Sequence, residues 1–148
     1  MKQVTIILAV VLLSIGVQDL SAQYSFGATK KDLKKDYPEL NYKYHFKLFK
    51  HSFFGGVDNR GTLVAKFDDR GYSNIFYWKL TDGYLPAFLN YLDEYGTNNG
   101  NIWILEGTVK DIYVLYVESE NLFIITEKKE TAISLSKDRV FIKSFSSL

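Results

Sequence analysis

The sequence contains no cysteine, which excludes both disulfide bonds and the lipid-modified N-terminal cysteine of bacterial lipoproteins. Histidine is scarce as well, because His45 and His51 are the only two, and they do not form a cluster with metal-ligand spacing. The lysines Lys43 and Lys47 flank His45 in the sequence and disfavour a bound cation there. We therefore predict no metal site and no cofactor, and a fold held together by its apolar core.

Long apolar runs are also scarce. The run from Val4 to Val17 covers about 14 residues, fewer than the roughly 20 that a membrane-spanning helix needs. Lys2 precedes it and the polar, small residues Gln18 to Ala22 follow, which is the order of a secretory signal peptide. We predict that residues 1–22 are a signal peptide cleaved before Gln23, with an uncleaved N-terminal anchor as the alternative. One soluble domain, residues 23–148, would then lie in the periplasm or outside the cell, without a transmembrane span.

Catalytic motifs are missing or out of context. Ser134 and Lys137 match the S-x-x-K pattern of penicillin-recognising enzymes, but the partner motifs are absent. There is no G-x-S-x-G, and no Gly-Lys-Ser/Thr follows Gly55 and Gly56. We predict no catalytic residue, although carboxylates that meet only in space leave a small hydrolase of envelope polymers as the alternative. With a net charge of +1, nucleic acid is not an expected partner.

The spacing of apolar residues predicts an α+β domain. Thr29 and Asp32 form a variant capping box, and Pro38 ends the helix that they begin. Gly71 and Gly96 mark a hairpin turn and the end of a second helix. The predicted order is α-β-β-β-α-β-β-β, a meandering antiparallel sheet with two helices packed on one face. We expect helices at 30–37 and 85–95, and strands at 40–49, 62–67, 72–80, 102–108, 112–118 and 122–126, with 131–135 and 140–145 as candidates for extra C-terminal strands. The repeated order leaves an internal duplication open.

Charge is divided unevenly along the chain. Residues 24–66 carry nine basic and four acidic side chains, whereas residues 67–148 carry eight and twelve. At about 100° per residue, Lys30, Lys31, Lys34 and Lys35 fall within an arc of about 140° on the first helix. This face is a candidate site for an anionic partner, and the alternative is a face that only keeps the domain soluble.

Aromatic residues make up 16% of the chain and occupy both faces of two predicted strands. Tyr77 and Trp78 point to opposite faces of one strand, and Trp103 lies on another. We interpret these three as a candidate aromatic face for a partner. The alternative is that they belong to central strands whose second face is covered by the C-terminal segment or a loop.

Several features together resemble small exported proteins of the Bacteroidota that have no known activity. They are Ser21-Ala22-Gln23, the hairpin from Phe67 to Tyr72, the helix after it and the strand of Trp103. The resemblance implies an envelope location and brings no catalytic residues. The layout is also similar to that of an outer-membrane-assembly lipoprotein and of β-lactamase inhibitor proteins, although architecture does not establish function. We expect an exported, non-enzymatic interaction module whose partner is an envelope protein, a glycan or an anionic surface.

Overall fold

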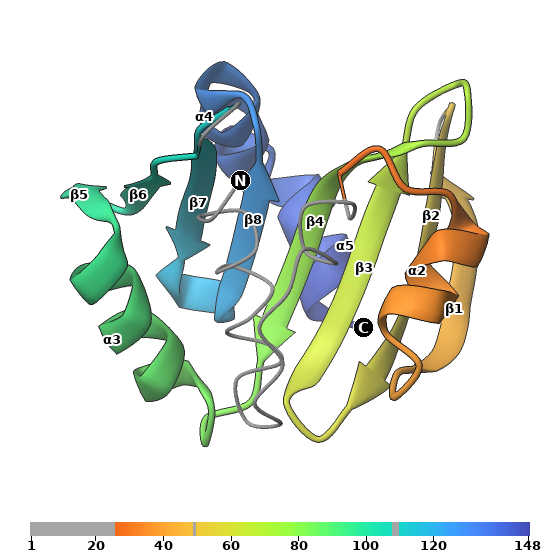
Figure 1. Ribbon diagram of the computed structural model, residues 1–148, viewed down its shortest axis with the longest axis horizontal. Coiled ribbons are helices and arrows are strands. Elements are labelled where there is room, and N and C mark those ends of the chain that lie inside the picture. The colour runs from red at the N-terminus through yellow and green to blue at the C-terminus, as the bar shows by residue number, and fades with distance from the viewer. Residues whose placement is uncertain (1–25, 49, 108–109) are drawn as a thin grey trace.

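The computed structural model describes residues 26–48, 50–107 and 110–148, and it contains one antiparallel sheet of eight strands (Figure 1). The predicted signal peptide and its cleavage site lie outside these residues. The strands follow one another in the order β1-β2-β3-β4-β8-β7-β6-β5 across the sheet. The prediction of an α+β domain with a meandering antiparallel sheet is confirmed. The strands are β1 (Asn41–Leu48), β2 (His51–Asp58), β3 (Gly61–Phe67), β4 (Ser73–Leu80), β5 (Thr97–Asn99), β6 (Ile102–Leu105), β7 (Ile112–Val117) and β8 (Leu122–Thr126).

The chain folds as two halves with the same order of elements. Helix α2 (Lys30–Asp36) precedes β1 to β4, and helix α3 (Leu85–Tyr95) precedes β5 to β8. The halves meet where β4 pairs with β8, in a register centred on Tyr77 opposite Ile124. Exchanging the two strands reproduces this register, and both helices pack against the same core cluster. The topology therefore has an approximate twofold axis between β4 and β8.

The structure adds a strand to each half of the predicted order, β2 in the first and β5 in the second. The sequence interpretation assigned Gly55 and Gly56 to a loop, because glycine usually marks turns. In the structure both lie inside β2, where neighbouring backbone comes very close. A Cβ atom at Gly55 would collide with the carbonyl oxygen of Leu63, and one at Gly56 would collide with that of Asn41. These glycines serve close strand packing and not a turn.

The two C-terminal runs that were candidates for strands are helices, α4 (Lys129–Lys137) and α5 (Arg139–Ser146). The side chain of Asp138 caps α5 by accepting a hydrogen bond from the backbone N–H of Phe141 (3.0 Å). Phe141, Ile142 and Phe145 are buried on one side of this helix. The expected pair of helices, α2 and α3, shares one face of the sheet, and α4 and α5 cover the other.

Two hydrophobic cores result, one on each side of the sheet. Phe76, Trp78 and Phe123 belong to the core beneath α2 and α3. Tyr77 and Ile124, their neighbours along β4 and β8, belong to the core beneath α4 and α5. This explains why apolar side chains fill both faces of the central strands, since a sheet covered on both sides does not alternate with polar residues.

In the described part of the chain, no helix is long and apolar enough to cross a membrane. A short 3-10 turn, η3 (Glu118–Glu120), links β7 to β8.

Candidate anion-binding surface

Helix α2 is fixed in place by its first turn and by its buried side. The backbone N–H of Asp32 donates to Oγ1 of Thr29 (3.2 Å), and the backbone N–H of Thr29 donates to Oδ2 of Asp32 (3.0 Å). These hydrogen bonds confirm the predicted capping box. The Thr29 hydroxyl also donates to Oδ2 of Asp32 (2.7 Å), and this hydrogen bond, together with the one from the Thr29 backbone N–H, lowers the pKa of the Asp32 carboxyl. Leu33 and Tyr37, which are 3% and 1% exposed, turn toward the sheet. The lysines of α2 therefore lie on its outer sides.

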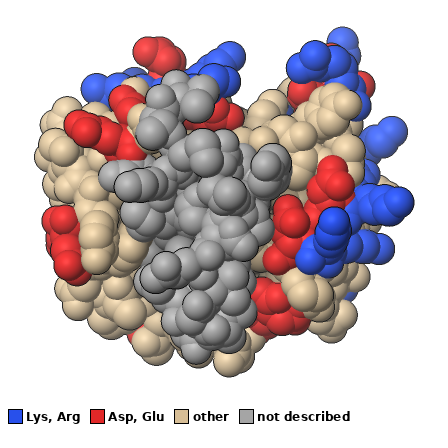
Figure 2. Space-filling model, in the orientation of Figure 1, with Lys and Arg blue, Asp and Glu red and all other residues tan. Residues whose placement is uncertain are grey.

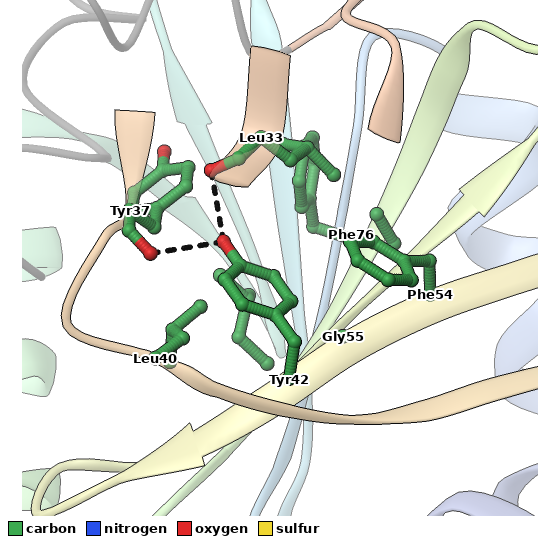
Figure 3. A pocket seen from close by; sticks show the side chains of 9 residues that line it. Leu33, Tyr37, Leu40, Tyr42, Phe54, Gly55 and Phe76 are labelled. Carbon is green, nitrogen blue, oxygen red and sulfur yellow. Dashed lines mark hydrogen bonds between the residues drawn. The ribbon is translucent and has the colours of Figure 1, made fainter. Parts of the chain in front are cut away.

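Tyr42 of β1 holds the C-terminal end of α2 against the sheet (Figure 3). Its hydroxyl lies 2.8 Å from the carbonyl oxygen of Leu33 and 3.0 Å from that of Tyr37, so it donates to the last turn of the helix. Burial raises the pKa of this phenol well above its usual range. The pocket around the Tyr42 ring has a volume of only about 10 Å³, room for about one water molecule, and none of the described residues that line it is a carboxylate. It is a packing gap and not a ligand site.

The four lysines of α2 divide into two pairs. Lys31 and Lys35 are exposed to solvent on the outside of the helix. Lys30 and Lys34 reach over the aromatic residues of the sheet, where Nζ of Lys34 lies 5.5 Å from the ring centre of Phe54. Lys30 is half-buried, and its ammonium lies 2.8 Å from Nε2 of His45 on β1. The helix thus extends its positive charge onto the sheet.

Strand β1 contributes two further exposed lysines, Lys43 and Lys47. A bulge between Tyr42 and Tyr44 leaves Lys43 without a partner residue on β2, and beyond it the strand alternates regularly. Lys47 is close enough to Lys30 that its charge, together with burial, lowers the pKa of the Lys30 ammonium. The sequence interpretation grouped only the lysines of α2. The alternation of Lys43, His45 and Lys47 was visible in the sequence, but only the tertiary fold places His45 and Lys47 beside α2. The ammonium of Lys43 lies 5.4 Å from the ring centre of Tyr44.

We name this group of six lysines the lysine surface; its members are Lys30, Lys31, Lys34, Lys35, Lys43 and Lys47. None of them has a carboxylate oxygen within 4.0 Å among the residues that the structure describes, whereas Lys110 and Arg70 do form such ion pairs with Glu127 and Asp68. Figure 2 shows basic side chains projecting from the end of the molecule where α2 and β1 lie. Within the described residues these lysines form no ion pair, although Lys31 and Lys35 lie near enough to Asp32, and Lys35 to Asp36, for their charges to interact.

The three aromatic residues predicted to form a partner face are buried instead. Tyr77, Trp78 and Trp103 are 1%, 3% and 6% exposed. The ring of Tyr77 stacks on Phe145 of α5 with their centres 4.1 Å apart, and the indole N–H of Trp103 donates to Oδ1 of Asp93 (2.8 Å). The alternative interpretation applies: these are central strands, and the C-terminal helices cover their second face. The three rings do not form an exposed patch.

The described ranges hold no group of three or more Asp, Glu or His side chains that could bind a metal ion. Glu39 and Asp58 are engaged by the guanidinium of Arg60. Ser134 and Lys137, expected in a strand, lie on α4 and are exposed.

No family model, no curated protein and no solved structure matches this chain. The site is therefore interpreted from its own geometry and charge.

Proposed function

We propose that the chain is an exported, non-enzymatic binding module that binds an anionic macromolecule of the cell envelope through the lysine surface. The observation that carries the proposal is the set of six lysines without a carboxylate partner in the described residues. Like charges at i,i+4 on a helix repel by a few tenths of a kcal/mol, so Lys30–Lys34 and Lys31–Lys35 do not stabilise α2. An anionic partner would offset this repulsion, because its negative charges would attract the lysines.

The position of the lysine surface suits this role. Four of the lysines lie on a helix that is fixed by its capping box and by Tyr42, and two lie on a sheet strand. A charge array on rigid elements binds with a smaller loss of conformational entropy than one on a loop. Export is supported by the order of charged, apolar and small residues at the N-terminus. A location in the envelope would bring the module close to anionic lipids, acidic glycans and acidic protein segments.

The test compares two variants that lose the same charge at different places. In the surface variant, Lys30, Lys31, Lys34 and Lys35 are changed to Gln. In the control variant, four lysines on the opposite face of the sheet are changed to Gln. They lie on α4, on α5 and at the position before α4, and are Lys128, Lys129, Lys137 and Lys143. Retention is measured on three immobilised probes: polyglutamate, polygalacturonate, and vesicles of phosphatidylglycerol and phosphatidylethanolamine.

We expect the surface variant to bind at least one probe about tenfold or more weakly than the parent chain, because each basic residue near an anionic surface is worth about 1 kcal/mol. The control variant should bind that probe like the parent. Raising the salt from about 0.1 M to 1 M should release the parent, since the screening length falls from about 10 Å to 3 Å. Equal losses in both variants, or no loss in either, would overturn the proposal and leave a solubilising role for the lysines.

A further inference from the structure

Strand β1 forms one edge of the sheet and leaves its outer side open. It pairs only with β2, and no other segment in the described ranges hydrogen-bonds to its outer side. Beyond the bulge at Lys43, residues Tyr44 to Leu48 run in regular register opposite His51 to Gly55. Every second residue of such an edge directs its N–H and C=O groups outward, where another strand can pair with them. The opposite edge of the sheet is β5, which has only three residues.

The two faces beside the β1 edge differ sharply in chemistry. On the α2 side lie Lys47, His45 and the ammonium groups of Lys30 and Lys34. On the α5 side, three half-buried side chains pack against the second core without being fully covered: Tyr44, Phe46 and Leu48. A strand placed beside β1 would therefore have cations next to one of its faces and mainly hydrocarbon next to the other, where the ammonium of Lys43 lies 5.4 Å from the ring centre of Tyr44.

The positive charge of the β1 edge argues against a second copy of this chain as the strand that pairs with it. If the β1 strands of two copies paired antiparallel, Lys43 and Lys47 of one copy would lie near the same lysines of the other. Like charges on neighbouring strands destabilise pairing, and lysine on an edge strand is a common protection against self-association. The same lysines favour an incoming strand that carries carboxylates.

We propose that an extended segment of a partner protein, with acidic and apolar residues in alternation, adds to the sheet as a ninth strand beside β1. This inference rests on the proposed function and specifies the partner as an acidic peptide segment. Successive side chains of a strand point to opposite faces, so the carboxylates would meet Lys30, Lys34 and Lys47 while the apolar residues cover Tyr44, Phe46 and Leu48. Backbone hydrogen bonds along Tyr44 to Leu48 would supply the pairing.

The first measurement compares synthetic peptides on the parent chain. One peptide alternates Glu and Val over seven residues between Gly-Ser ends, and a second has the same composition with all Glu before all Val. We expect the alternating peptide to bind about tenfold more tightly, because only it presents carboxylates and hydrocarbon to the correct faces. Equal binding of the two peptides would overturn the added strand and still leave the anionic-partner function in place. If the parent chain bound none of the anionic probes, both the added strand and the proposed function would be overturned.

The second measurement locates the peptide, using the absence of cysteine in the chain. A single cysteine is introduced at His45→Cys on β1 or, as the matched control, at Asn98→Cys on the opposite edge. In the alternating peptide one Glu next to the central residue is replaced by a cysteine activated as its thiopyridyl disulfide, so that the protein thiol displaces thiopyridine. We expect mixed disulfide formation with the β1 variant to be at least about tenfold faster, since a cross-strand neighbour lies within about 5.5 Å. Equal rates at the two edges would overturn the assignment. Thermal melts of both variants establish that each is folded.

Discussion

At the scale of single residues, the guanidinium of Arg60 is a buried charge near the β2–β3 turn. Its side chain is 5% exposed, and it pairs with Asp58 and with Oε1 of Glu39 at 2.9 Å. The carboxylate of Asp58 also accepts a hydrogen bond from the backbone N–H of Arg60 (2.8 Å), which closes the turn. Glu39 follows α2, so Arg60 connects the segment after the helix to this end of the sheet.

Replacing Arg60 by Met should lower the free energy of unfolding by about 3–5 kcal/mol, because it leaves the Asp58 carboxylate, whose side chain is 9% exposed, without its cation. The matched control is Arg70→Met. Arg70 pairs with Asp68 at 3.6 Å but its side chain is 81% exposed, so its loss should cost no more than about 1 kcal/mol. Urea unfolding of both variants measures the difference. Similar losses for the two would contradict the structural role assigned to Arg60.

At the scale of elements, the C-terminal helices show why the sequence pattern suggested strands at 131–135 and 140–145 where the chain forms α4 and α5. The alternation of Ile133 and Leu135 resembles a strand, and branched residues such as Val140 and Ile142 favour one. The burial pattern instead follows the helix, because Phe141, Ile142 and Phe145 reach the face of the sheet that holds Tyr77 and Phe53. Aromatic residues on both faces of the central strands indicated that this face could be covered, but the tertiary structure was needed to show that α4 and α5 cover it. The capping box of α2 could be predicted because its hydrogen bonds join residues three apart.

The importance of α5 as a cover can be tested with Phe145→Ala. The ring of Phe145 is 3% exposed and packs on Tyr77, Phe53 and Phe141, so its removal should cost about 3–5 kcal/mol through lost burial and a cavity. Val140 on the same helix is 78% exposed, and Val140→Ala should change stability by less than about 0.5 kcal/mol. Thermal melts compare the two variants. An unchanged melting temperature for Phe145→Ala would mean that α5 does not stabilise the sheet.

At the scale of the whole molecule, the repeat of a helix and a strand meander could be anticipated from the order of elements, and the twofold arrangement could not. The register that centres β4 and β8 on Tyr77 and Ile124 joins residues far apart in the sequence. The lysine surface, too, could be predicted from the sequence only in part. Periodicity along α2 was enough to group its four lysines, whereas the contribution of Lys47 required the contact between α2 and β1.

Both cores contain tyrosine hydroxyls that share one response to pH. Tyr42 and Tyr91 lie in or against the core beneath α2 and α3, and Tyr77 lies in the core beneath α4 and α5. Burial raises the pKa of all three phenols above the usual range of tyrosine. In the unfolded chain these phenols ionise near pH 10. Above that pH the unfolded state has lost protons that the folded state retains.

Stability should therefore be fully present below about pH 10 and should fall as the pH rises beyond it, by up to about 1.4 kcal/mol per pH unit for each phenol that folding keeps protonated. Urea unfolding between about pH 8 and pH 11 measures this decline. Tyr77→Phe should make the decline shallower without lowering stability at neutral pH, because the buried Tyr77 hydroxyl has no hydrogen-bond partner among the described residues. Tyr72→Phe, at a side chain that is 42% exposed, is the control and should leave the decline unchanged. If Tyr77→Phe and the parent chain lost stability at the same rate, the ionisation of Tyr77 would not contribute to alkaline unfolding.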